Sequence, residues 1–222
     1  MKTKLINLIA KRAGITAMIL VGIIALKASA SNQSQLNQSI TEGAKSIDIV
    51  TSTGTTVASP SVSFSSTAFS FDTQDTTGTL GVSEQRIRVY NPTSTATWTA
   101  SIAGSATDAT WTTGSAYYDF NDPNGSGYTD GGTDTDSYGG QLAVAPAAGT
   151  LAGVSGCATT NVSLGSNSAF DEGTTDSITI ASGASGAPTF CRWDITNIGL
   201  TQKIPAAQTA GSYSLSLVLS II

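Results

Sequence analysis

Apolar and polar residues alternate along much of this chain. In residues 211–222, "GSYSLSLVLSII", every second position from Tyr213 to Ile221 is a large apolar or aromatic residue. The positions between them are serines, with Val218 as the exception. Because successive side chains of a β-strand point to opposite faces, this pattern predicts a strand with one buried and one exposed face. Such half-buried strands are typical of antiparallel sandwiches and barrels.

The same alternation recurs in shorter segments, and no window shows a helical apolar stripe. The predicted strands include "SIDIV" (46–50), "SVSFSSTAFSF" (61–71), "RIRVY" (86–90), "TWTASIA" (97–103), "DSITIAS" (176–182) and "CRWDI" (191–195). Glycine, asparagine and proline mark turns between them. In "RIRVY" the pattern predicts Ile87 and Val89 inside, with Arg86 and Arg88 outside. We therefore predict an all-β fold, an antiparallel β-sandwich of about nine or ten short strands with long polar loops.

The N-terminal segment has the three parts of a secretory signal peptide. Four basic residues precede an uncharged apolar run, residues 15–26, which ends shortly before Ala28-Ser29-Ala30. This order predicts a cleaved signal peptide over residues 1–30 and a single β-sandwich domain over residues 31–222. An uncleaved membrane anchor is the alternative, although the run is short for a bilayer span. The prediction is a protein secreted to an extracellular cell surface.

Export would change the charge balance of the chain. Five of the ten basic residues lie before residue 31, whereas all fifteen acidic residues lie after it. The exported chain would carry a net charge of −10, counted from those two sets. Such a surface disfavours nucleic acid and anionic lipid as partners, and it is compatible with divalent cations. We therefore expect no nucleic-acid partner, and no membrane contact after cleavage.

Two cysteines and the absence of histidine limit the chemistry. Cys157 and Cys191 are the only cysteines, so in an oxidising compartment we expect them to form one disulfide. Without histidine the chain cannot build Ser-His-Asp or Cys-His catalysis or the usual catalytic zinc sites. A glycosidase using two carboxylates is the enzymatic alternative. A glycine-rich acidic loop, however, lacks the apolar surroundings that raise a carboxyl pKa, so we expect no enzyme.

One loop concentrates acidic and amide side chains. Residues 117–140, "YYDFNDPNGSGYTDGGTDTDSYGG", hold five of the fifteen acidic residues. Calcium binds carboxylate and carbonyl oxygens on flexible loops. The candidate ligands are Asp119, Asn121, Asp122, Asn124, Asp130, Asp134 and Asp136. The spacing does not match an EF-hand, and a long solvated turn is the alternative because Asp and Asn favour turns by themselves.

Two segments resemble elements of WxL domains. "RIRVYNPTSTATWTASIAG" (86–104) is similar to the central strand–turn–strand with its Trp-x-Leu motif, with Trp98 at the tryptophan position and Ala100 at the leucine position. "IPAAQTAGSYSLSLVLSII" (204–222) resembles the end of such domains, with Leu219 and Ile221 in the places of the second motif. The resemblance covers roughly residues 47–222.

This resemblance implies a noncatalytic bacterial cell-surface module that binds the cell wall without a covalent link. Its partners would be peptidoglycan or other surface proteins. Trp98 and Trp111 are candidates for stacking on a ligand, and burial in the core is the alternative, above all for Trp98. The alternative function is a structural subunit of a fibre or surface layer that self-assembles by strand exchange.

Overall fold

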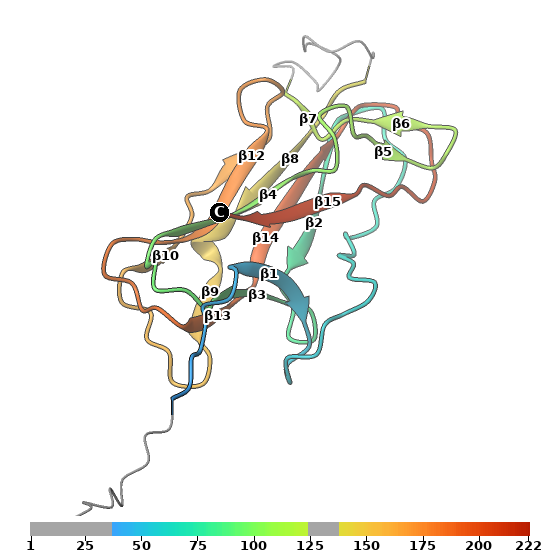
Figure 1. Cartoon of the computed structure of the whole chain (residues 1–222). Coiled ribbons are helices and arrows are strands. Elements are labelled where there is room, and N and C mark those ends of the chain that lie inside the picture. Colours follow the sequence, from blue (N-terminus) through green and yellow to red (C-terminus); the bar gives the residue numbers. More distant parts are fainter. Residues whose placement is uncertain (1–36, 124–137) are drawn as a thin grey trace, which may run out of the picture. The chain divides into compact units, whose positions relative to one another are not determined.

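The computed structural model describes residues 37–123 and 138–222 (Figure 1). Within this range, Glu42–Ile222 form one compact unit of β-strands with a single short 3₁₀ helix, Pro146–Ala148. The all-β prediction is confirmed. None of the described helices is long and apolar enough to cross a membrane. The predicted signal peptide, residues 1–30, lies outside the described residues.

The strands are short, as the sequence predicts. In chain order they are β1 (Ser46–Val50), β2 (Gln74–Leu80), β3 (Arg86–Asn91), β4 (Trp98–Gly104), β5 (Trp111–Thr112), β6 (Tyr117–Tyr118), β7 (Asn121–Asp122), β8 (Gly140–Ala145), β9 (Thr150–Gly153), β10 (Val162–Leu164), β11 (Ser168–Ala169), β12 (Ser177–Gly183), β13 (Cys191–Thr196), β14 (Ile198–Ile204) and β15 (Leu217–Ile221).

These strands form a sandwich in which one layer is bent. One sheet has the order β10-β12-β4-β15, and all its pairs are antiparallel. Facing it are two sheets, β1-β3-β13-β9 and β11-β8-β14-β2, with β7 also paired to β8. Three chain segments pass from one of these sheets to the other, because β2 leads to β3, β8 to β9 and β13 to β14. The two sheets are therefore the halves of one bent layer (Figure 1).

The bend lies at the three connections between the two sheets. Asn197, between β13 and β14, has a positive φ of 60° and donates its backbone N–H to the carbonyl of Gly81 at 3.1 Å. Gly81 has a φ of 81°, and a Cβ added there would lie 2.9 Å from the carbonyl oxygen of Ile195. A side chain at Gly81 would thus meet both backbone strain and a steric clash.

The core lies between the two layers. The rings of Trp98 on β4 and Trp193 on β13 join the layers with their centroids 5.3 Å apart. The other fully buried apolar side chains come from the alternating positions of the central strands, and include Ile87, Val89, Ala100, Ile102, Leu142, Val144, Ile178, Ile180, Ile195, Ile198 and Leu200. The inward faces predicted for residues 86–90, 97–103, 176–182 and 191–195 are confirmed.

One predicted strand is absent. Residues 61–71 are extended but form no strand, and a single backbone hydrogen bond, from Ser65 N–H to the Thr77 carbonyl (2.8 Å), ties them to β2. Val62 and Phe64 pack on the core, whereas Phe69 and Phe71 are 53% and 82% exposed. Alternation of apolar and polar residues indicates an extended backbone. A strand also needs backbone hydrogen bonds to a neighbouring strand over several residues, and β2 offers this segment little more than one.

Arg88 lies on the predicted face of its strand, but it is buried there. Arg88 lies on the outer face of β3, yet it is only 5% exposed. The turn that follows β1 covers it, so closely that a Cβ on Gly54 would lie 2.4 Å from Arg88 Nη1. The sequence pattern assigns Arg88 to the correct face, but it does not show that another segment of the chain covers that face.

Candidate functional site

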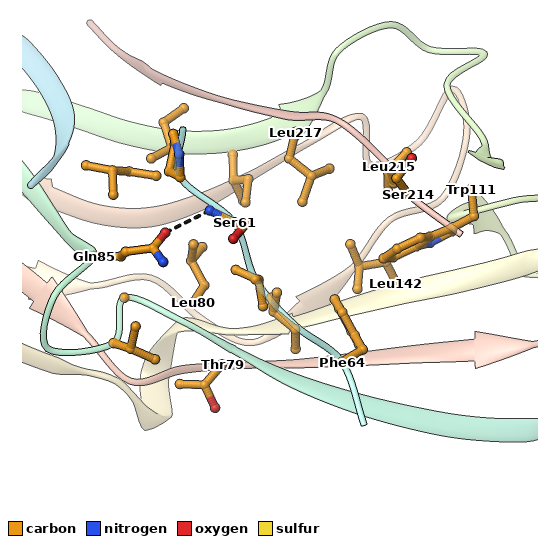
Figure 2. A pocket seen from close by; sticks show the side chains of 18 of the residues that line it. Ser61, Phe64, Thr79, Leu80, Gln85, Trp111, Leu142, Ser214, Leu215 and Leu217 are labelled. Atoms are coloured by element: carbon orange, nitrogen blue, oxygen red, sulfur yellow. Dashed lines mark hydrogen bonds between the residues drawn. The ribbon is translucent and has the colours of Figure 1, made fainter. Parts of the chain in front are cut away.

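An apolar pocket of about 290 Å³ lies at the edge of the sandwich formed by β15. Leu217 and Leu219 of β15 line one side of it, together with Leu215 just before that strand. The bent layer supplies Leu80, Leu142 and Leu200. Figure 2 shows Leu80, Leu142, Leu215 and Leu217 around one space together with Phe64 and Trp111. No charged side chain lines the pocket among the described residues.

The backbone of β15 has one free edge. Ile222 and Thr99 exchange both backbone hydrogen bonds at 3.1 Å, and Ser105 N–H donates to the Ser216 carbonyl at 3.0 Å. In an antiparallel pair, alternate residues point their backbone groups at the partner, so the even-numbered residues of β15 face β4. Leu217, Leu219 and Ile221 therefore direct N–H and C=O away from β4, and within the described chain no other strand pairs with them.

The opposite edge of the pocket is covered. Residues 60–65, here called the covering segment, run beside β2. Val62 and Phe64 line the pocket, and Figure 2 shows Phe64 turned towards it. Gln85 Oε1 accepts the N–H of Ser61 at 2.7 Å and holds the start of this segment. The covering segment fits against β2 because Gly78 has no side chain; a Cβ there would lie 3.0 Å from Val62. The covering segment therefore shields the edge of β2 at the pocket.

Aromatic side chains close one end of the pocket. Trp111 stacks on Tyr118 with centroids 5.8 Å apart, and Phe64 meets the Trp111 ring edge-on at 5.2 Å. Trp111 Nε1 donates a 2.8 Å hydrogen bond to Oε1 of Gln202, a fully buried residue of β14. Burial raises the pKa of the Tyr118 phenol, and the neighbouring Tyr213 raises it further. Trp111 thus has a structural place in this cluster, and ligand stacking on it stays a prediction.

Trp98, the other candidate for ligand stacking, is in the core. Its side chain is 3% exposed and lies against Trp193, which agrees with the core alternative for this residue. The Trp98 Nε1 hydrogen has no acceptor among the described residues. The Trp98 ring packs against Gly183 of β12, where an added Cβ would lie 2.3 Å from Trp98 Nε1.

Three of the seven candidate calcium ligands are described, and all three are buried. Asp119, Asn121 and Asp122 are each at most 2% exposed. Asp119 Oδ1 accepts the N–H of Phe120 at 2.6 Å, and Asn121 Nδ2 donates to the Thr107 carbonyl at 3.1 Å. Asn121 and Asp122 form β7 and pair with β8. The solvated-turn alternative is therefore wrong for these three residues.

The apolar residues of this segment are buried as well. Tyr118 and Phe120 alternate with the polar residues and point into the core, where Phe120 meets Phe170 edge-on at 5.1 Å. Asn124, Asp130, Asp134 and Asp136 lie outside the described residues. Within residues 37–123 and 138–222, no group of three or more acidic or cysteine side chains is arranged to hold a metal. Calcium binding stays a prediction.

The Cys157–Cys191 disulfide is confirmed, with the two Cα atoms 5.7 Å apart. It ties the segment after β9 to the first residue of β13. Beside it, Trp193 Nε1 donates to the carbonyl of Ala158 at 2.9 Å. The bridge therefore fixes a loop onto the strand that carries the central tryptophan.

A second hollow, of about 650 Å³, lies over β1, β3 and the start of β13. It is lined by Asp48, Tyr90, Arg192 and Phe190, beside the disulfide. Phe190 is 62% exposed and has a positive φ of 53°, an uncommon backbone state for an aromatic residue. These residues carry no distinctive sequence signal, because each has an ordinary place in or beside a strand.

Comparison of the chain with protein-family models, with curated proteins and with solved structures finds no match. The resemblance to WxL domains therefore stays a prediction.

Proposed function

We propose that this protein is a noncatalytic structural subunit of an extracellular surface, and that copies of it join into a fibre or layer by adding a β-strand to the free edge of β15. The observation that carries the proposal is the position of this edge. The unpaired backbone of Leu217 and Leu219 borders an open apolar pocket. An added strand gains hydrogen bonds from such an edge, and it places alternate side chains in such a pocket.

Burial of side chains in the pocket would supply much of the free energy needed to add a strand. Each large aliphatic side chain that moves from water into the pocket contributes roughly 1.5–3 kcal/mol. Two such side chains, together with the backbone hydrogen bonds, offset a large part of the cost of ordering and association. Natural proteins normally protect exposed strand edges with charges, prolines or bulges. Residues 215–222, LSLVLSII, contain neither a charged residue nor a proline.

The disulfide supports the extracellular part of the proposal. A protein disulfide persists in oxidising compartments, and the Cys157–Cys191 bridge is part of this fold. The predicted signal peptide points to the same compartment.

Light scattering on residues 31–222 over a range of concentrations tests this proposal. The variant Leu217→Lys places a charge on the pocket side of β15, and Val218→Lys places the same charge on the outer face, where Val218 is already 49% exposed. We expect the unmodified protein and Val218→Lys to assemble with rising concentration, and Leu217→Lys to stay monomeric while keeping its β-sheet circular dichroism. An unmodified protein that stays monomeric at every concentration overturns the proposal.

Attachment to wall polymer is the second candidate function, and the hollow beside Phe190 favours it. An exposed aromatic ring next to Arg192 and Asp48 offers both a stacking surface and hydrogen-bonding groups for a glycan. Cosedimentation with purified peptidoglycan, in calcium and in EDTA, tests it. We expect the protein to pellet, and Phe190→Ala to pellet less. Pelleting that EDTA abolishes would support a calcium-braced wall-binding module, whereas no pelleting in either buffer rules out wall binding.

A further inference from the structure

We propose that the strand added to β15 comes from residues 34–41 of a second copy of this chain. This inference rests on the proposed self-assembly and names the donor segment for it. Each copy would then carry both a donor strand and an acceptor pocket, and each of these would find its partner only on another copy.

The segment before β1 has an apolar side chain without a packing partner. Residues 37–45 contain no strand. Ile40 is 87% exposed, the highest value among the large apolar side chains of the described residues. A single copy thus leaves Ile40 in water and the β15 pocket open at the same time. Insertion of Ile40 into the pocket of another copy would remove both apolar surfaces from water.

The sequence of the segment places its two large aliphatic side chains on one side of an extended strand. In an extended backbone Leu36, Gln38 and Ile40 point to one side, and Asn37, Ser39 and Thr41 point to the other. Leu36 and Ile40 are four positions apart, as are Leu215 and Leu219 on the pocket side of β15. The two donor side chains can therefore lie alongside the leucines of β15 in one register.

Charge favours this segment over the exposed segments around Phe71 and Val82. Residues 31–41 contain no charged side chain, and no described residue lining the pocket is charged. Phe71 is followed directly by Asp72, and Val82 lies two residues before Glu84. Burial of either carboxylate in an apolar pocket would cost far more free energy than burial of the uncharged residues 34–41.

The segment is also long enough. An extended strand advances about 3.3 Å per residue, so residues 31–41 reach about 36 Å and the edge from Leu215 to Ile221 needs about 23 Å. The residues that follow are anchored, because Gly43 N–H donates to the Pro92 carbonyl (3.2 Å) and Lys45 Nζ to the Thr97 carbonyl (2.7 Å). A donor strand fixed at this end can transmit a defined orientation from one copy to the next.

The test uses residues 31–222 with Ile40→Asp, and with Ser39→Asp as the matched control. Both changes add one charge to a residue that is exposed in the single copy, so neither should disturb the fold. We expect Ile40→Asp to raise the concentration needed for assembly by roughly tenfold or more. Ser39→Asp should assemble nearly as the unmodified protein does, because its side chain would face away from the pocket.

Mixing two defective variants gives a second, independent readout. Ile40→Asp keeps an intact pocket and Leu217→Lys keeps an intact donor, so together they should form a one-to-one complex although neither assembles alone. Failure to form this complex overturns the inference. If the unmodified protein assembles and Ile40→Asp assembles equally well, another segment is the donor, and the proposed self-assembly stands without this inference. If the unmodified protein does not assemble at all, both are overturned.

An engineered cysteine pair, Ile40→Cys with Leu217→Cys, separates exchange between copies from closure within one copy. We expect oxidation to produce a ladder of linked chains on a non-reducing gel. A single linked monomer would mean that the segment fills its own pocket, which overturns the inference.

Discussion

Arg88 and Asp194 face each other across β3 and β13 and form a buried, two-pronged ion pair. Arg88 Nη2 donates to Asp194 Oδ2 at 2.9 Å, and Arg88 Nε donates to Oδ1 of the same carboxylate. Each of the two residues is 5% exposed. Hydrogen bonding to Asp194 raises the pKa of the Arg88 guanidinium, although burial alone would lower it. This pair fixes the register of two strands and lies beneath the turn at Gly54.

Asp194→Asn should therefore be strongly destabilising. The substitution leaves the buried guanidinium of Arg88 without its counter-charge, and we expect the free energy of unfolding to fall by about 3–5 kcal/mol. Asp75→Asn is the control, because Asp75 forms a more exposed pair with Lys203 at 3.3 Å and should cost less than about 1 kcal/mol. Urea unfolding of both variants measures the difference, and equal losses would contradict the role of burial.

Reduction of the disulfide should also lower stability. The two cysteines are separated by 34 positions, and the chain-entropy relation gives about 4 kcal/mol for a loop of this size. Urea unfolding with and without reductant measures the effect. A double Cys→Ala variant should be less stable than the oxidised protein and insensitive to reductant. Unchanged unfolding after verified reduction would show that the bridge does not restrain the unfolded chain as expected.

Tyr118 should make stability sensitive to alkaline pH. Its folded pKa is raised by burial and by Tyr213, so the unfolded phenol ionises first as the pH rises past about 10. Below that pH both states keep the proton and the contribution to stability is complete. Above it, the free energy of unfolding falls by up to about 1.4 kcal/mol per pH unit until the folded phenol also ionises. Tyr118→Phe should lose stability less steeply over this range, and identical slopes would contradict the prediction.

Gly183→Ala should disturb the central tryptophans. The new Cβ would lie 2.3 Å from Trp98 Nε1, so the Trp98 ring must shift against Trp193. Overpacking of this kind costs about 1–3 kcal/mol, and the intrinsic tryptophan fluorescence should change with it. Gly199→Ala, whose Cβ would meet Ala145 at an ordinary 3.7 Å, is the control and should change stability little. A large loss in the control would show that strand backbone effects dominate.

Calcium should stabilise the protein if residues 117–140 hold the ion. At a calcium concentration one hundred times the dissociation constant, the free energy of unfolding should rise by about 2.7 kcal/mol relative to EDTA. Thermal unfolding measures the shift, with magnesium as a control because it demands a smaller and more regular site. Asp134→Asn combined with Asp136→Asn should abolish it. Identical unfolding in calcium and EDTA would contradict the calcium prediction.

Only part of the sheet structure could be predicted from alternation. The strands around Val89, Ile102, Ile180 and Trp193 were identified because β-branched or aromatic residues recur at every second position. The strands β2, β8 and β14 were not identified, although Leu142 and Val144 in β8 do alternate. These strands are rich in Gly, Ala, Thr and Gln, which give a weak signal for burial.

Gln202 shows why alternation of apolar and polar residues fails to predict β14. It occupies an inward position of β14 and is fully buried, where a sequence pattern would place a polar side chain in water. Its amide nitrogen donates to the Asp119 carbonyl at 3.0 Å, and its oxygen accepts from Trp111. Both partners lie more than eighty residues away in the sequence. A local pattern contains no information about such partners, so this burial could not be foreseen.

The sequence by itself determined the all-β class, the inward faces of the central strands and the disulfide. These depend on the period-two geometry of an extended backbone and on the presence of only two cysteines. The tertiary structure decided which strands pair, where the second layer bends, which polar groups are buried, and that β15 ends its sheet beside an open pocket. Strand pairing joins segments that are far apart in the chain, and the pairing leaves an edge free only where no further segment reaches it. No local pattern encodes that outcome.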